Sequence, residues 1–283
     1  MSGPGDGPSL AVVYRFLLKP RWILSHVFVL VVCVTMINLG FWQLARLDEK
    51  RTNNARIEAA MVEPARPIAS VLPDGASSTP DQVTAAEYRP VVVVGTYRVD
   101  EQVLVMNRTF NSVPGYWVVT PLVQSDGTAV VVLRGWIPFS YTSSGSWEDF
   151  APPSGTVAVQ GIVRPSQERS TNALVSSPKD PSTGVLRELA RLDVGRLAQQ
   201  LDERTMPGYV QLVAQDPPAG TLPAAISLPE LSEGPHLGYA VQWFAFTALT
   251  LIVYPLLLRR VARQRAAEAA GGSDADTTPS GVA

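Results

Sequence analysis

The sequence predicts two transmembrane α-helices that flank a mainly antiparallel β-rich (α+β) domain outside the cytoplasm. Two apolar segments free of Asp, Glu, Lys and Arg are each long enough to cross a hydrocarbon core of about 30 Å as a helix. Between them, valine-rich runs alternate with turn residues, a pattern typical of strands. The expected order is a cytoplasmic segment (1–21), a first helix (22–44), an extracytoplasmic domain (45–236), a second helix (237–258) and a cytoplasmic basic segment with a disordered tail (259–283).

The composition of the chain excludes several functions. Its 283 residues are 46% hydrophobic and carry a formal net charge of −2, so no basic surface is expected that would neutralise nucleic-acid phosphates. Cys33 is the single cysteine, which excludes an intrachain disulfide framework or a cysteine metal cluster. The two histidines, His26 and His236, are too few for a Ser-His-Asp triad or a multi-histidine zinc site in the central region. We therefore expect a protein that is not an enzyme.

Residues 22–44 predict a first transmembrane helix that is retained. The segment is longer than the apolar core of a signal peptide, and no small-residue cleavage site follows it. Helix-forming residues at 47–60 should extend the helix until Pro64. One face of the helix is polar and consists of Thr35, Asn38, Trp42 and Arg46. Helix packing with an interfacial Trp-Arg anchor explains this face, and a ligand site is the alternative.

The second apolar segment also has a polar face. Its members recur at steps of three and four, and they are His236, Tyr239, Trp243, Thr247, Thr250 and Tyr254. Lipid offers no partner for hydroxyl, imidazole or indole N–H groups, so this face should contact protein or a cofactor. One interpretation is an aromatic belt with packing contacts, and the other makes His236 a metal or haem ligand. Pro255 either kinks this helix or ends it.

The charges that flank the two segments predict their orientation. Four arginines follow the second segment at positions 259, 260, 263 and 265, whereas residues 217–236 contain no Lys or Arg. Because basic residues accumulate on the cytoplasmic side, we expect both termini in the cytoplasm and the central domain on the outer face of a bacterial plasma membrane. His26 and His236 then lie in opposite leaflets, about 25 Å apart at helical rise, and cannot both bind one iron in a monomer.

The central domain is predicted to follow a linker at residues 64–82, which is rich in Pro, Ser, Gly and Asp. Strands are expected within residues 89–99, 102–108, 115–123, 128–138, 156–165 and 208–215. Asp126-Gly127 predicts a type I′ hairpin turn, because both residues tolerate positive φ. Five leucines predict a helix at 185–201, and a long polar loop at 138–155 contains Trp147. These elements should close into a sandwich or small barrel.

The polar groups of this domain do not form a recognisable catalytic pattern. They are Asn107-Arg108, Arg134-Gly135-Trp136 and Arg191-Leu192-Asp193, and none has the spacing of a nucleophile and its base. An arginine beside a strand end is expected to be solvated or ion-paired. The chain also lacks a glycine-rich phosphate loop.

Several short motifs occur in a particular order along the chain. They are the run from Leu39 to Arg46 with Lys50, then Gly95-Thr96-Tyr97, Asn107-Arg108, the run from Arg134 to Pro138, and His236 with Tyr239-Ala240 and Trp243-Phe244. Together they cover roughly residues 20–260 and resemble the Surfeit locus protein family, the cytochrome c oxidase assembly factors. In that family Asn often stands immediately before the histidine, where this chain has Pro235.

The resemblance implies a membrane-anchored assembly factor for aa3-type cytochrome c oxidase that assists delivery or insertion of haem a into the catalytic subunit. It makes His236 the candidate haem a ligand, with Tyr239 and Trp243 as pocket neighbours. Residues expected to dock on oxidase subunits, or on the wider respiratory supercomplex, are Trp42, Gln43, Arg46, Thr247 and Tyr254. One alternative is a structural subunit that stays bound to the oxidase. Another is a membrane-tethered adaptor unrelated to respiration.

Overall fold

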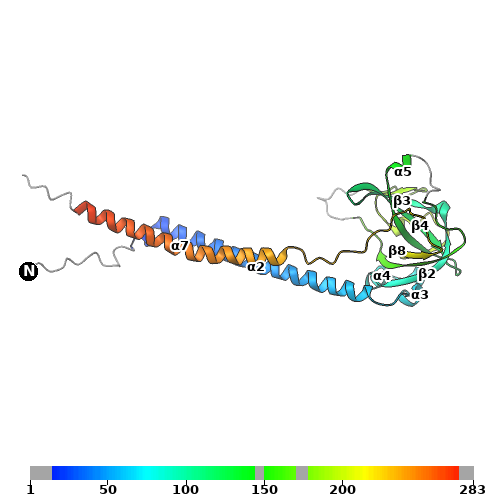
Figure 1. Ribbon diagram of the computed structural model, residues 1–283, viewed down its shortest axis with the longest axis horizontal. Helices are drawn as coiled ribbons and strands as arrows, with labels where there is room; N and C mark the ends of the chain where they lie inside the picture. Colours follow the sequence, from blue (N-terminus) through cyan, green and yellow to red (C-terminus); the bar gives the residue numbers. More distant parts are fainter. Residues whose placement is uncertain (1–14, 144–149, 170–177, 274–283) are drawn as a thin grey trace, which may run out of the picture. The chain divides into compact units, whose positions relative to one another are not determined.

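The computed structural model describes residues 15–143, 150–169 and 178–273. It divides into two units, one formed by Met1–Asn54 with Ser232–Ala283 and the other by Ala55–Leu231 (Figure 1). The first unit is a helical hairpin and the second is a β-domain. Trp147, which the sequence places in a polar loop, lies outside the described residues.

The hairpin consists of α2 (Pro20–Met61) and α7 (His236–Ser273), with a short 3₁₀ turn, η1 (Arg15–Leu18), before α2. The two long helices run side by side in opposite directions (Figure 1). α2 continues past residue 44 as the helix-forming residues predict. The prediction of a disordered tail is wrong for residues 266–273, which continue α7; residues 274–283 lie outside the described part. Pro255 lies inside α7 and does not end it.

Both helices present apolar side chains to their surroundings. In their most apolar stretches, 17% of α2 and 6% of α7 is buried, whereas the core helix of a soluble protein is mostly buried. Leu24, Phe28, Val241 and Ile252 are among the exposed side chains. The chain therefore has two helices long and apolar enough to cross a membrane. The crossing itself and the orientation stay predictions.

The helices meet along a seam that repeats every seven residues. On α2 its less exposed positions are Trp22, His26, Val29, Cys33, Met36, Gly40, Gln43, Leu47 and Asn54. Alternating steps of four and three residues are the spacing of a coiled-coil seam. Gly40 allows a close approach of the two helices, because a Cβ there would lie 2.7 Å from the ring of Phe244. Ala240 and Thr247 are buried on the opposing helix.

The β-domain is a mixed sheet that closes on itself. Its strands are β1 (Arg66–Pro67), β2 (Pro90–Tyr97), β3 (Val103–Phe110), β4 (Val113–Val123), β5 (Thr128–Pro138), β6 (Thr156–Pro165), β7 (Glu188–Leu189) and β8 (Arg204–Asp216). Their order is β1-β2-β6-β8-β5-β4-β3-β7, and β2 also pairs with β4. Strands β2, β6, β8, β5 and β4 thus form a ring, as expected for a small barrel. The predicted antiparallel pairing holds for most of the ring, but β5 and β8 are parallel.

The interior of the ring is an apolar core to which all five strands contribute, for example through Val93, Leu122 and Val132. The predicted linker at 64–82 is wrong, because this stretch folds onto the core. It forms α3 (Ile68–Val71) and η2 (Gly75–Ser77) and leads into α4 (Pro80–Ala85), which a Thr79–Gln82 capping box begins. Ile68, Leu72 and Val83 are buried in this core. Their apolar side chains outweigh the turn-forming composition around them.

The predicted helix at 185–201 is also wrong. This stretch contains β7, and its helix, α6 (Val194–Ala198), is a single short turn with Asp193 as its N-cap. Leu189, Leu192 and Leu197 are nevertheless buried, in a second core against β3, β4, β5 and β8. Strand β5 is therefore covered on both faces, which explains its uninterrupted apolar run.

The hairpin between β4 and β5 lies where the sequence places it, but its turn is not type I′. Gly127 has a positive φ of 80°, and Asp126 is not among the residues with positive φ. The Gly127 N–H donates to the Gln124 carbonyl, and the Asp126 carboxylate accepts from the Thr128 N–H. This is a three-residue loop of a type I turn followed by a left-handed glycine.

Candidate functional site

His236 is the first residue of α7, and its ring is held by α2. Its Nδ1 lies 2.8 Å from Oε1 of Gln43. An amide oxygen only accepts hydrogen bonds, so Nδ1 donates in this contact, and a neutral ring then has its lone pair on Nε2. Gln43 lies on the hairpin seam, one turn beyond Gly40, and this position brings its amide to the ring. The sequence places Gln43 among docking residues and does not predict that it pairs with His236.

The backbone before His236 passes beside the Nε2 edge of the ring. Gly234 has a φ of 70°, and a Cβ added there would lie 3.6 Å from Nε2. Only glycine adopts this conformation without strain. Pro235 does not weaken the helix, because the first N–H groups of a helix have no intrahelical acceptor. Its carbonyl accepts from the Tyr239 N–H at 3.1 Å.

The segment that leads into His236 is tied to α2 by polar contacts. Arg51 donates from Nε and Nη2 to the two carboxylate oxygens of Glu233, at 2.8 and 2.9 Å. Asn54 donates to the Ser232 carbonyl. Hydrogen bonding to Arg51 lowers the pKa of Glu233. The position of His236 is thus supported from both sides, by Gln43 and by this paired segment.

The donor set suits a group held through one side chain rather than a metal cage. Among the described residues, no group of three or more His, Cys, Asp or Glu side chains is placed to hold a metal ion. One neutral imidazole with a free Nε2 is the proximal ligand type of many haem proteins. A second-sphere acceptor on Nδ1, as Gln43 provides, fixes the ring and raises its basicity. The residues present therefore fit a haem bound through one side.

The other two predicted pocket residues lie differently. Tyr239 is 48% exposed, whereas Trp243 is half-buried and packs edge to face on Phe246. Trp243 lies two turns from His236, about 10 Å along the helix. Tyr239 is the nearer of the two to the open ring, one turn away.

The predicted docking residues fall into two groups. Trp42 and Arg46 lie on the outer surface of α2, and Arg46 forms an ion pair with Glu49. Thr247 and Tyr254 face the seam, where Thr247 is buried and donates to the Trp243 carbonyl. The outward pair is available for a partner, and the inward pair stabilises the hairpin. Docking on a partner stays a prediction for all of them.

A second polar cluster lies at the opposite end of the hairpin. The hydroxyl of Tyr254 is 2.6 Å from Nδ1 of His26 and 3.0 Å from the Ser25 hydroxyl. His26 and Gln43 are 17 positions apart on α2, which is about 25 Å. The two histidines are therefore separated as the sequence predicts. Arg265 stacks on Phe16 near this end, with 4.5 Å between its guanidinium carbon and the ring centre.

The sequence model of the SURF1 family matches residues 30–248, a range that includes Gln43, the β-domain and His236 but not His26 or Tyr254. The chain belongs to the SURF1 family.

Several relatives of this SURF1 family member match along most of their length. An uncharacterized SURF1-like protein of Mycobacterium tuberculosis is 28% identical over 263 residues, covering 92% of each chain. A SURF1-like protein of Rickettsia felis is 24% identical and covers 84% of this chain and 98% of its own. The cytochrome oxidase assembly protein SHY1 of Saccharomyces cerevisiae is 31% identical over 150 residues, 51% of this chain and 36% of its own.

The β-domain of this SURF1 family member contains a charged residue whose surroundings differ from those predicted from the sequence. Arg134, expected to be solvated or ion-paired, is 2% exposed and pairs with no carboxylate among the described residues. Burial lowers its pKa to about 10, and the same environment raises the pKa of Tyr97 to about 12. A buried donor without a partner costs about 1–3 kcal/mol. The sequence does contain an indication that Arg134 is buried. Side chains alternate along β5, and this alternation places Arg134 on the same face as Val130 and Val132.

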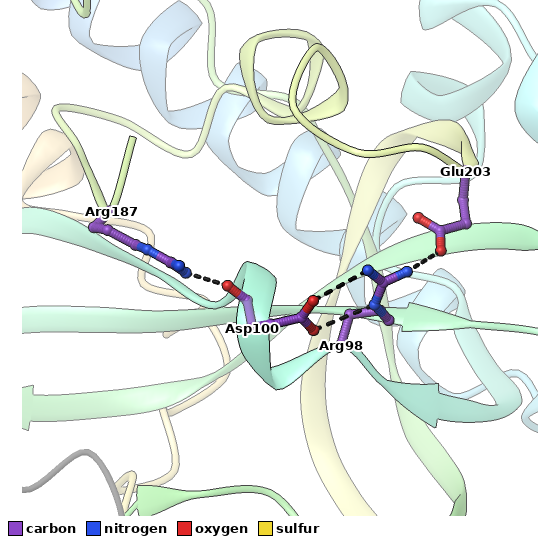
Figure 2. A network of polar contacts seen from close by, with 4 residues as sticks. All are labelled: Arg98, Asp100, Arg187 and Glu203. Carbon is purple, nitrogen blue, oxygen red and sulfur yellow. Dashed lines mark hydrogen bonds and ion pairs between the residues drawn. The ribbon is translucent and has the colours of Figure 1, made fainter. Parts of the chain in front are cut away.

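A polar network stabilises the turn next to Arg134. Figure 2 shows Arg98 between two carboxylates, with donors 3.3 and 3.1 Å from Asp100 and a further donor on Glu203. Arg187 donates to the Asp100 carbonyl. Asp100 lies in the 3₁₀ turn η3 (Val99–Glu101), which is followed by Gln102. This network fixes the position of Gln102, whose side chain accepts from Arg134 at 3.0 Å.

Proposed function

We propose that this chain is a membrane-anchored assembly factor for aa3-type cytochrome c oxidase that presents haem a to the catalytic subunit. The observation that carries the proposal is the hydrogen bond between His236 Nδ1 and Gln43 Oε1, which leaves Nε2 as a free ligand atom. When bound, haem a supplies the redox centre that the oxidase needs. The chain itself carries out no redox step in this proposal.

The chain's own residues have separate tasks in this proposal. His236 would hold the iron through Nε2, and Gln43 orients the ring through Nδ1. Gly234 keeps its side of the Nε2 edge free of a side chain, because a Cβ at this position would contact the ring. Tyr239 offers an exposed aromatic surface one turn away. Holding the cofactor through one side chain would suit a protein that passes it on.

The charges of the hairpin support a cytoplasmic location for both termini. Because the helices are antiparallel, the basic residues before α2 and those in α7 gather at one end; they are Arg15, Lys19, Arg21, Arg259, Arg260, Arg263 and Arg265. Near the other end, Arg51 is neutralised by Glu233 and Arg46 pairs with Glu49. The positive-inside rule therefore favours a bacterial plasma membrane protein with its β-domain on the outer face.

The partner in this proposal is the oxidase. The yeast relative is named a cytochrome oxidase assembly protein, which supports oxidase subunits as the partner here. Exposed Trp42 and Arg46 offer a docking surface on α2, and the wider respiratory supercomplex is a further candidate partner. The same outward surface favours a second function, that of a structural subunit that stays bound to the oxidase.

Purification of the terminal oxidase from detergent-solubilised membranes distinguishes the two functions. We expect His236→Ala to lower the haem a content of the oxidase, with this chain present in less than stoichiometric amount. His26→Ala is the matched control, because it removes the other imidazole and should leave haem a unchanged. A stoichiometric chain with full haem a in the His236→Ala strain would favour the structural subunit. Normal oxidase content in a deletion strain would contradict both functions.

A further inference from the structure

Arg134 has an unused edge inside the β-domain. Its Nη1 donates to Gln102 Oε1 and to the Phe150 carbonyl, at 3.0 and 2.8 Å. Its Nε and Nη2 are buried and have no hydrogen-bond partner among the described residues. These two nitrogens form one edge of the planar guanidinium, the edge that binds both oxygens of a carboxylate. The hydrogen bonds of Nη1 hold this edge in place.

No protein group in the described part of the chain neutralises this charge. Buried arginines are normally paired with a carboxylate, because an unpaired buried charge is costly. The groups that shift the pKa of Arg134 are its own burial, which lowers it, and Tyr97, which raises it. The guanidinium carbon lies 5.5 Å from the centre of the Tyr97 ring. An aromatic face stabilises a cation but does not replace a counter-ion.

Arg134 also lines a cavity of about 390 Å³. The other walls are the end of β8, at residues 212–215, and the segment that follows it. Leu212, Pro218 and Pro223 are apolar parts of this lining, and Gln215 is a polar part. Cavities of this size hold small molecules, and a mostly apolar wall with one charged group is their usual composition.

We propose that this cavity binds a small organic acid, with its carboxylate on Arg134 and its apolar part against Leu212, Pro218 and Pro223. A carboxylate supplies the acceptors that Nε and Nη2 lack, and because both nitrogens are fully buried, the ligand reaches them only when the side chains that cover this edge move. Arg134 is the single charged residue among the described residues of the lining, so a monoanion matches it, whereas inorganic phosphate would bring more negative charge than the site neutralises. The site belongs to the β-domain and does not depend on the haem function proposed above.

The test uses the full chain in non-ionic detergent micelles, with ¹⁵N-labelled arginine. Butyrate is titrated at constant ionic strength, and the Nε–H resonance of Arg134 is followed by NMR. We expect a saturable shift of this resonance with butyrate. Butyramide has nearly the same shape without the charge, and we expect it to bind at least tenfold more weakly. Equal binding of the two probes, or no saturable shift with butyrate, would overturn the proposal.

Two variants examine the site itself. Arg134→Met should abolish butyrate binding, as measured by calorimetry, whereas Arg204→Met, which alters an exposed arginine of β8, should not change it. Gly220→Phe should weaken binding at least tenfold while Arg134 stays in place. Gly220 lines the cavity, and a Cβ added there meets no atom within 4 Å. The second variant keeps the test valid if Arg134→Met does not fold.

Two further outcomes would also overturn the proposal. Tighter binding of inorganic phosphate than of butyrate would contradict the assignment to a carboxylate. Glu148 and Asp149 precede Phe150 in the sequence and lie outside the described residues. If Glu148→Gln or Asp149→Asn shifts the Arg134 resonance without added ligand, the counter-ion comes from the chain itself.

Discussion

The Nδ1 of His236 and the Oε1 of Gln43 are 2.8 Å apart, and this contact joins the start of α7 to the middle of α2. It fixes the tautomer of the one imidazole at this end of the hairpin. The haem proposal depends on it, and so does the first prediction.

Gln43→Leu should weaken haem binding by about 10–100-fold, because the ring loses the acceptor that orients it. His236→Ala should abolish the binding. The measurement is an absorbance titration of the purified chain with haem in micelles. Asn38→Leu is the control, since Asn38 donates to its own helix and lies on the outer face of α2. Unchanged affinity in Gln43→Leu would contradict a role for this residue.

Gly40→Leu should push the two helices apart by about 2 Å, because interaxial distance depends on the side chains at the contact. The Cβ of residue 40 would lie 2.7 Å from the Phe244 ring. Spin labels at positions 30 and 252, in a Cys33→Ala background, would report the distance. Gly238→Leu is the matched change on α7, where a Cβ meets open space. An equal effect of both substitutions would show that the close approach at Gly40 is unimportant.

Gly115→Ala should destabilise the β-domain by about 3 kcal/mol. A Cβ at this position of β4 would lie 2.1 Å from the Ile137 carbonyl oxygen, so the backbone of β5 would have to move. Urea unfolding followed by near-ultraviolet circular dichroism measures the change. Gly220→Ala should have little effect, since nothing lies within 4 Å of the added Cβ. A stable Gly115→Ala variant would contradict the register of β4 on β5.

Arg98→Gln should raise the pKa of Asp100. Hydrogen bonding to Arg98 now lowers that pKa (Figure 2). Because the pKa of Asp100 is lower in the folded chain than the unfolded value of about 3.9, ionised Asp100 stabilises the fold at pH values above about 3.9. This stabilisation is lost as the pH falls. The variant should therefore lose less stability on acidification. We expect a difference below about 1 kcal/mol because the pair is exposed to solvent.

An NMR titration of the Asp100 carboxyl carbon measures this pKa directly. Arg204→Gln serves as the control, because Arg204 donates to Ser77 and not to Asp100. The prediction fails if the Asp100 pKa is the same in the wild-type chain and in Arg98→Gln.

The sequence by itself determined the two helices, the strands of the ring and the family. These features depend on local patterns: the length of two charge-free segments, runs of valine between turn residues, and motifs in a particular order. A helix satisfies its own backbone, and a strand shows its alternation within a few residues. Neither requires knowledge of a distant partner.

Only the tertiary structure decided how residues far apart in the sequence are used. The stretches at 64–82 and 185–201 look like a linker and a helix, yet each covers the barrel because its few apolar side chains find a core there. The same holds for single residues. Gln43 reaches His236 across 193 positions, and Arg134 is buried because closure of the sheet places its side chain inside. Such contacts arise from the packing of separate elements, which no local pattern encodes.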